Sequence, residues 1–368
     1  MRCIRTLLGA GLAALCPIAL AHAEVRIGAA GPLTGTMAWF GEQHEKGVAM
    51  AVAEINEAGG LLGQPIEMIV VDDYCDGEQG VAAARKLIVD GVVFVAGHLC
   101  SGAAIPASAL YQEAGIIMIS GTATNPKLTE QGFRNVYRVV NRDSEQARLA
   151  GDHLAERWAD AKIAILHDGT VYGQDLAEAT RRQLNQRGVK EAQFGHITPG
   201  LPDYGEMVAV LQAAAIEVLF YGGYTAEAAL IARQSHDRDY NLQLLGGDNL
   251  NGEYFLQVAG PGAKGVRFVS MADPRRHEAA APVMAKFRAE GYEPEGFTLY
   301  GHAVVQVWAQ AVEKAGTFEA DAVAEALRNN EFDMVLGRLG FDAKGDVTGV
   351  ESFIWYVWTN SGYLPAEE

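Results

Sequence analysis

The chain has 368 residues, a formal net charge of −17 at pH 7 and a hydrophobic share of 49%. This length exceeds the usual size of a single hydrophobic core, so two domains are expected. The acidic balance favours solubility and argues against a partner with a phosphate backbone, so we expect no nucleic-acid partner.

The first 23 residues have the pattern of a Sec-type signal peptide. Arg2 and Arg5 form a short basic region, an apolar run extends from Leu7 to Leu20, and Ala-His-Ala stands at 21–23. At about 14 residues, this run is shorter than the roughly 20 residues that span a membrane. We therefore expect cleavage after Ala23 and export to the periplasm. Because two arginines and no acids leave with the peptide, the formal charge falls from −17 to −19.

Two of the four cysteines, Cys3 and Cys16, fall within this segment. Cys16 also allows processing as a lipoprotein, although the residue before it is not small. The remaining Cys75 and Cys100 predict one disulfide, because an exported chain meets an oxidising compartment. Closing a loop of about 25 residues would contribute roughly 3–4 kcal/mol. Two buried thiols, or a zinc site formed with His98, are the alternatives.

The next part of the chain alternates apolar strands with amphipathic helices. Strands are expected over Val25–Ala30, Ile66–Val71, Val92–Ala96 and Ile116–Ser120, and helices over Trp39–Glu57, Glu78–Asp90 and Ala103–Glu113. Strands this apolar are buried on both faces, and their alternation with helices predicts a doubly wound parallel sheet.

The same order of elements then begins again without a repeat of the sequence itself. Strands are expected over Lys162–His167, Val189–Thr198, Val218–Tyr221 and Leu242–Gly246, with helices between them such as Leu149–Trp158 and Asp175–Arg187. The fold class predicted is therefore α/β, with two doubly wound, Rossmann-like lobes.

The tail contains a helix over Phe297–Ala315, a short helix over Val323–Leu327 and a strand over Phe353–Val357, which could complete either lobe. Several crossings between lobes would make a hinge of several segments, as proteins that close on a ligand require. We place the first lobe at 24–141 plus 272–349 and the second at 142–271 plus 350–368, with the ligand cleft between them.

Ligands in such sheets sit beyond the carboxyl ends of the strands. In the first lobe, Ser101 is placed to cap a helix, and a helix N-terminus favours a carboxylate. In the second lobe, Asp248 follows two glycines at a strand end and suits pairing with an ammonium group, while Tyr172 ends the loop after the first strand. Taken singly, these residues could equally be an ordinary cap or turn.

Enzyme signatures are weak. Gly28–Pro32 lacks the glycine spacing of a dinucleotide turn, and no metalloprotease helix, phosphate-binding lysine loop or nucleophile elbow occurs in the sequence. A hydrolytic set of Ser101, His98 and Asp72 can be imagined, but no spacing demands it. We expect no enzymatic activity, no cofactor and no metal.

Taken together, several loops resemble the periplasmic leucine/isoleucine/valine-binding proteins of ABC transporters, from about Val25 to the C-terminus. The matching motifs are Ala53–Asn56 with Gly59–Gly60, Asp72–Asp76, Gly97–Ser101, Tyr111–Ile119, His167–Asp168 with Tyr172–Gly173, Tyr221–Tyr224 and Lys344–Asp346. The resemblance implies the type I periplasmic-binding-protein fold, a membrane permease as partner and a disulfide between Cys75 and Cys100.

The resemblance also implies a role for individual residues. Ser101 and Thr124 match positions that hold the α-carboxylate of an amino acid, and Thr122 matches one whose carbonyl receives the ammonium group. Tyr224 contributes a ring to the same polar site, and Asp248 falls where the family usually has a glutamate. The positions that match the side-chain pocket are Phe40, Leu99, Cys100, Ala123, Tyr172 and Phe297.

Two of these residues depart from the family pattern. Asp248 is one methylene shorter than glutamate, so the ammonium group must lie deeper or a water must intervene. Phe40 lacks the phenol hydroxyl that the branched-chain binders often have there, which makes that wall more apolar. Both departures leave the side-chain preference open, because one methylene changes binding by only about 1–3 kcal/mol.

We therefore expect a monomeric receptor that closes on an amino acid, with leucine, isoleucine or valine preferred, and delivers it to an ABC transporter permease. The first alternative is a receptor of the same fold for an aromatic acid, a short amide or urea. The others are an exported hydrolase and a sensor module whose output domain belongs to a separate protein.

Overall fold

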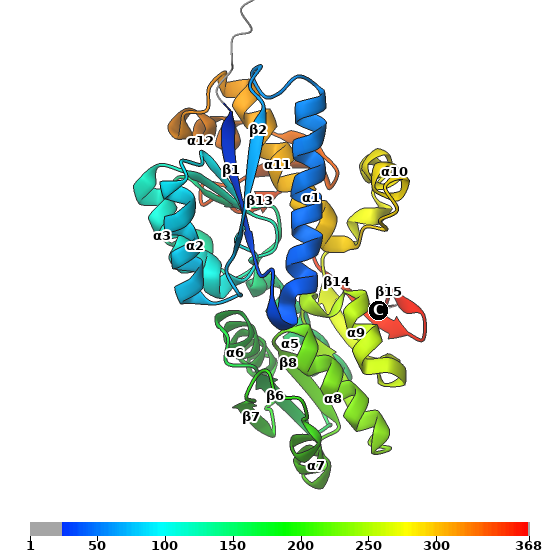
Figure 1. Cartoon of the computed structure of the whole chain (residues 1–368). Coiled ribbons are helices and arrows are strands. Elements are labelled where there is room, and N and C mark those ends of the chain that lie inside the picture. The colour runs from blue at the N-terminus through cyan, green and yellow to red at the C-terminus, as the bar shows by residue number, and fades with distance from the viewer. Residues whose placement is uncertain (1–23, 367–368) are drawn as a thin grey trace, which may run out of the picture.

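The computed structural model describes residues 24–366 of the chain. The predicted signal peptide, its cleavage point and the lipoprotein alternative at Cys16 lie outside these residues. Two α/β lobes follow one another along the long axis of the molecule, with several connections between them (Figure 1). No helix within residues 24–366 is long and apolar enough to cross a membrane.

The first lobe is built on a five-stranded sheet in the order β2-β1-β3-β4-β5, in which every neighbouring pair is parallel. Its strands are β1 (Val25–Gly31), β2 (Ile66–Asp72), β3 (Phe94–Ala96), β4 (Ile117–Ser120) and β5 (Val136–Arg138). Strands with this order and direction bring the loops that follow β3 and β4 to one edge of the sheet, facing the second lobe.

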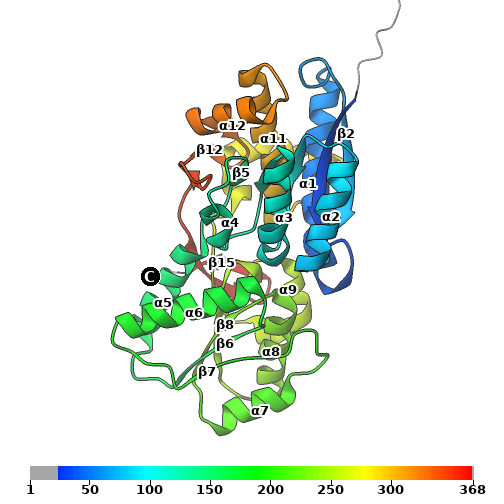
Figure 2. The ribbon, with the colours of Figure 1, turned by 90° about the vertical axis from the view of Figure 1, so that its left-hand side faces the viewer.

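Helices cover both faces of this sheet because its strands are apolar on both sides (Figures 1 and 2). One face packs against α1 (Ala38–Glu57) and α11 (Gly296–Ala315), where the rings of Phe94 and Trp308 stack at 4.6 Å. The other face packs against α2 (Gly77–Val89) and α3 (Ser101–Ala114). The lobe is completed by α4 (Lys127–Glu130), α10 (Ala281–Ala289), α12 (Ala320–Asn329), β11 (Phe332–Met334), β12 (Gly337–Phe341) and β13 (Val347–Thr348).

The second lobe is built on a seven-stranded sheet in the order β15-β14-β10-β9-β8-β6-β7. Its parallel strands are β6 (Ile163–His167), β7 (Gln193–His196), β8 (Val218–Gly222), β9 (Gln243–Gly246) and β10 (Arg267–Ser270), and two antiparallel strands, β14 (Ile354–Thr359) and β15 (Gly362–Pro365), extend the sheet. One face is covered by α5 (Asp143–Arg157) and α6 (Val171–Gln186), the other by α7 (Gly205–Ala213), α8 (Thr225–Asp237) and α9 (Glu253–Ala259).

The tail, which could have completed either lobe, divides between them. The helix expected over Phe297–Ala315 is α11 and packs on the first sheet, whereas the strand expected over Phe353–Val357 is β14 and pairs with β10 of the second. The strand expected over Val189–Thr198 is shorter, because β7 spans only Gln193–His196. Strands β5, β10, β11, β12, β13 and β15 were not anticipated.

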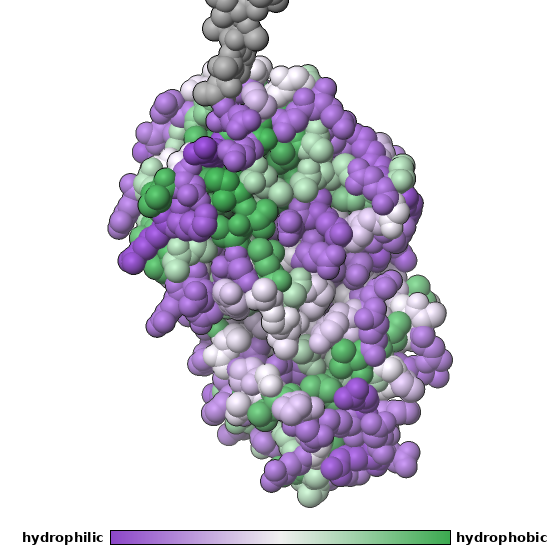
Figure 3. Space-filling view, in the orientation of Figure 1, coloured by the Kyte–Doolittle hydropathy of each residue, from purple (hydrophilic) through white to green (hydrophobic). Residues whose placement is uncertain are grey.

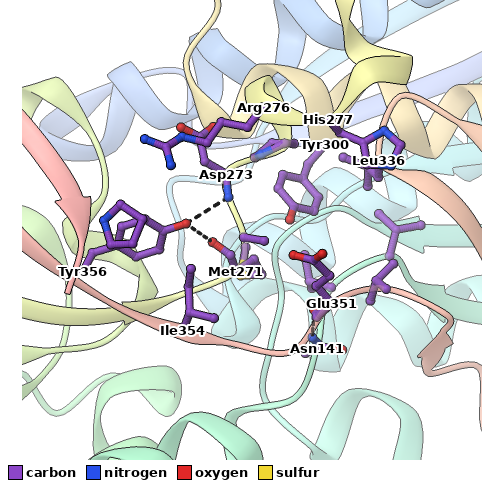
Figure 4. A pocket seen from close by; sticks show the side chains of 16 residues that line it. Asn141, Met271, Asp273, Arg276, His277, Tyr300, Leu336, Glu351, Ile354 and Tyr356 are labelled. Atoms are coloured by element: carbon purple, nitrogen blue, oxygen red, sulfur yellow. Dashed lines mark hydrogen bonds between the residues drawn. The ribbon is translucent and has the colours of Figure 1, made fainter. Parts of the chain in front are cut away.

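Three segments connect the two sheets, between β5 and α5, between β10 and α10, and between β13 and β14. They enclose a cavity of about 290 Å³ together with Tyr300 and Leu336 (Figure 4). The Tyr356 hydroxyl accepts from the Asp273 backbone N–H at 3.0 Å and donates to the Met271 carbonyl at 3.3 Å, which ties the connection after β10 to strand β14. The lobe boundaries expected near 141, 271 and 349 stay a prediction.

Candidate ligand-binding cleft

A second cavity lies where the carboxyl ends of the two sheets face each other. It is lined by Phe40, Leu99, Ser101, Thr122, Tyr172, Tyr224, Asp248, Asn249 and Phe297. The cavity is small: its volume of about 10 Å³, counted over the positions that the centre of a water molecule can occupy, leaves room for about one water. On the face seen in Figure 3, the side chains of the two lobes meet and leave no open cleft between them. The lobes must therefore move apart before a larger ligand can enter.

The first lobe contributes hydroxyl groups and the N-terminus of a helix. Ser101 is the first residue of α3, and its Oγ accepts from the Asn125 backbone N–H at 3.3 Å. The Thr122 hydroxyl donates to the Leu99 carbonyl at 2.9 Å. Because the first N–H groups of a helix lack partners within it, this end of α3 favours a negatively charged group.

The residue before Ser101 is cross-linked to a neighbouring loop. Cys75 and Cys100 form a disulfide with their Cα atoms 5.2 Å apart, within the usual range. The predicted disulfide is therefore confirmed, and the alternatives of free thiols or a zinc site with these cysteines are wrong. The cross-link fixes the start of α3 against the loop that follows β2.

The imagined hydrolytic set is not assembled. The Nδ1 atom of His98 lies 2.7 Å from Asp73 Oδ2, and its Nε2 lies 3.0 Å from the Tyr111 hydroxyl, so both ring nitrogens are engaged away from Ser101. Asp72 instead accepts from the Leu33 backbone N–H at 2.9 Å. Ser101 thus has no base within this group to activate it.

The second lobe contributes a carboxyl group held by several donors. Asp248 follows β9, and its Oδ1 accepts from the Tyr172 hydroxyl at 2.7 Å and from Gln146 Nε2 at 3.0 Å. Burial raises the pKa of Asp248 to about 6, while these donors work in the opposite direction. The rings of Tyr172 and Tyr224 lie 5.3 Å apart and complete this side of the cavity.

A second carboxyl group lies directly behind Asp248. Asp143 begins α5, and its Oδ1 accepts from the same Gln146 amide at 3.0 Å. Burial, followed by the charge of Asp248, raises the pKa of Asp143 well above its ordinary value. Asp143, Gln146 and the cavity residue Asn249 were not found from the sequence.

Aromatic rings form the apolar wall of the cavity. Phe40 and Phe297 meet edge to face at 4.6 Å, and Trp39 stacks on Tyr254 of α9 at 5.7 Å. The latter pair joins the two lobes. Leu99 packs so closely on Gly31 that a Cβ at the glycine would lie 2.9 Å from the leucine side chain.

Three expected residues, Cys100, Ala123 and Thr124, do not line the cavity. The Ala123 carbonyl accepts from Arg138 Nη1 at 2.9 Å, and the Thr124 carbonyl accepts from the Asp143 backbone N–H at 3.0 Å. Three buried oxygens around the site nevertheless lack a hydrogen-bond partner, namely Thr124 Oγ1, Asp143 Oδ2 and Asn249 Oδ1. Of these residues only Asn249 lines the cavity, so its oxygen is the one within reach of a polar ligand, whereas Thr124 and Asp143 lie beside each other.

A family model described as periplasmic binding protein matches residues 24–362. The chain is also 40% identical over 359 residues to Leu/Ile/Val-binding protein homolog 1 of Brucella suis, with 96% of each chain covered. The chain belongs to the periplasmic binding protein family. Membership places it among binding proteins rather than enzymes, and it confirms the resemblance seen in the sequence.

Other periplasmic binding proteins show the same similarity. An amino acid binding protein of Pseudomonas aeruginosa is 40% identical, with 93% of this chain and 92% of that protein covered. A substrate-binding protein of an ABC transporter from Desulfitobacterium hafniense, solved in complex with Leu, superposes with a TM-score of 0.74 at 25% identity and covers 94% of this chain and 100% of its own. The predicted two-lobed α/β fold is confirmed.

Proposed function

We propose that this protein captures an aliphatic α-amino acid, with leucine, isoleucine or valine preferred, in the periplasm and delivers it to the membrane permease of an ABC transporter. The relatives named above support this proposal through what they bind. The observation that carries it is that Asp248 and the N-terminus of α3, at Ser101, border the same cavity. An acid and an anion-binding helix end match the ammonium and carboxylate groups of one zwitterion.

The two lobes divide the work between them. The first lobe binds the carboxylate through Ser101 and the N-terminus of α3, and the second adds Asp248 and Tyr224 when the cleft shuts. The ligand therefore gains its full set of contacts only in the closed state, and this difference in affinity shifts the protein towards closure. The closed monomer is then the form that the permease recognises.

The apolar wall sets the side-chain preference. Phe40, Leu99 and Phe297 offer rings and a branched chain without a buried charge of their own. Such a wall favours an aliphatic side chain over a polar one, because any polar group would lose its hydrogen bonds to water. The wall separates aliphatic side chains that differ by one methylene only weakly.

Isothermal titration calorimetry tests the proposal on the mature protein after ligand removal by unfolding and refolding. We expect saturable heats with leucine, isoleucine and valine and a weaker one with alanine. Benzoate, acetamide and urea serve as probes of the alternative ligand classes. Binding of one of these without any response to the amino acids would overturn the assignment, and so would silence from every amino acid tested.

A further inference from the structure

Two buried carboxyl groups share a single amide behind the cleft. Asp143 and Asp248 are each 2% exposed, and Gln146 Nε2 donates to the Oδ1 atom of both at 3.0 Å. The amide is also held from its other end, because Gln146 Oε1 accepts from the Asp248 backbone N–H at 3.0 Å. The NH2 group of Gln146 is thereby directed at the two acids.

The two acids are not equivalent in this arrangement. Asp248 Oδ1 receives a second donor, the Tyr172 hydroxyl at 2.7 Å, and Asp248 lines the cavity. Asp143 has one donor on Oδ1, its Oδ2 is buried without a partner, and it stands away from the cavity. Donors favour the ionised form of an acid, and two adjacent buried charges oppose each other. The negative charge therefore belongs on Asp248 and the proton on Asp143.

We propose that Asp143 stays protonated at neutral pH and acts as a positioning residue. Its neutral carboxyl group holds Gln146, and Gln146 in turn holds Asp248, which alone carries the charge that faces the cavity. This inference deepens the proposed function and rests on it for the ligand. The protonation of Asp143 itself can be measured without any ligand.

The surroundings of Asp143 agree with a neutral acid. Burial is the main cause that raises its pKa, the charges of Asp248 and Asp175 add to it, and the Thr124 hydroxyl and Arg138 oppose it. Arg138 is already engaged, since its Nε donates to Asp346 Oδ1 at 2.6 Å. The other ionisable groups facing this site are Tyr172 and Tyr224, whose pKa values are raised by burial so that both stay neutral.

A protonated Asp143 also has a hydrogen-bond acceptor nearby. Thr124 Oγ1 lies beside Asp143, and like Asp143 Oδ2 it is buried without a well-aligned partner. A hydrogen bond from a protonated Oδ2 to this hydroxyl would satisfy both atoms and leave the Thr124 proton available. An ionised Asp143 would instead take that proton for its own hydrogen bond.

Neutrality of Asp143 matches the charge of the site to that of a zwitterion. One charged acid balances one ammonium group, whereas a second charge would repel the ligand carboxylate. The arrangement thus favours an α-amino acid over a ligand with two amino groups. Calorimetry with leucine and with putrescine should show saturable heat for leucine only, and tighter binding of putrescine would contradict the proposal.

Infrared spectroscopy of the ligand-free protein tests the protonation directly. We expect a C=O stretching band of a protonated carboxyl group at pH 7 that is lost in Asp143→Asn. The matched control is Glu145→Gln, which changes an acid in the same turn of α5 that is not fully buried and should leave the band in place. A wild-type spectrum without this band would overturn the proposal.

Calorimetry tests the positioning role. Asp143→Ala should weaken leucine binding about tenfold, and Asp143→Asn, which keeps a donor and an acceptor, should recover most of that loss. Titrations in phosphate and in Tris should show release of far less than one proton per leucine. Release of about one proton would overturn the proposal, and so would leucine binding by Asp143→Asn that is as weak as that of Asp143→Ala while circular dichroism is unaltered.

If the wild type gives no heat with any amino acid, that result counts against the proposed function instead. The infrared measurement would still decide whether Asp143 is protonated.

Discussion

The two faces of the cleft hold their polar groups in different ways. On the first lobe, the Ser101 and Thr122 oxygens bond to backbone groups of neighbouring loops, and no charged side chain of that lobe lines the cavity. On the second lobe, Asp248 is buried with Asp143 behind it, and the pKa of each is raised. Most polar groups of the first face already have hydrogen-bond partners within the lobe. The second face carries a desolvated charge that only a cation can balance. Under the proposed function, selectivity for an ammonium group is thus obtained at a cost in stability.

The sharpest test of this contrast is to remove the charge. Asp248→Asn should lower the affinity for leucine by about a hundredfold or more, because an ammonium group would be buried without its partner. The control is Glu253→Gln, which removes one charge from an exposed residue that does not line the cavity. Calorimetry that shows less than a fivefold loss would mean that no ammonium group pairs with Asp248.

Asp248→Asn should also reveal how much the buried Asp248 carboxylate lowers the free energy of unfolding. The pKa of Asp248 is raised in the folded state to about 6 from an ordinary value of 3.8. Its contribution to stability is therefore fully present below about pH 4 and is lost as the pH rises through about 6. Asp248→Asn escapes this loss, so urea unfolding should find it more stable than wild type by about 3 kcal/mol at pH 7.5 and by only about 1 kcal/mol at pH 4.5.

Ser101→Ala, on the opposite face, is the control for this pH dependence. It should follow the wild-type profile, because it changes no ionisable group. An advantage of Asp248→Asn that is the same at pH 4.5 and pH 7.5 would contradict the assigned cost.

Ser101→Ala should in turn weaken leucine binding about tenfold through loss of one hydrogen bond to the ligand carboxylate. Leucinamide, which lacks that carboxylate, should lose less. Ser108→Ala is a matched control, because Ser108 is a buried serine of the same helix that donates to the Ile105 carbonyl instead of lining the cavity. Equal losses for leucine and leucinamide would place the carboxylate elsewhere.

The smallest effect is expected at the rim between the faces. Asp175 of α6 accepts from Asn125 Nδ2 and from Lys127 Nζ of the first lobe, each at 2.8 Å. Asp175→Asn should speed leucine release about threefold, since a partly exposed ion pair contributes little. Stopped-flow fluorescence of Trp39, which stacks across the lobes, would measure this rate. The control is Glu178→Gln on the same helix, and an equal effect from it would contradict a closing role for Asp175.

The alternation of apolar strands and helices was enough to predict the two lobes, because buried parallel strands leave a clear pattern. The tail was harder to assign to a lobe, since β14 pairs with β10, which lies far from it in the sequence. The disulfide followed from the two cysteines that remain after the predicted signal peptide, and most cavity residues followed from the resemblance of several loops to a known family. Asp143 and Gln146 carried no such signal, because an acid in the first turn of a helix is common and only the fold brings it behind Asp248.

The disulfide has a consequence for when the receptor becomes competent. Cys100 directly precedes Ser101, so the same covalent bond that ties two loops also fixes the helix end that we propose as the carboxylate site. A chain held in a reducing compartment would keep these thiols free and start α3 from a looser loop. Under the proposed function, competence for capture is then acquired only where these thiols oxidise.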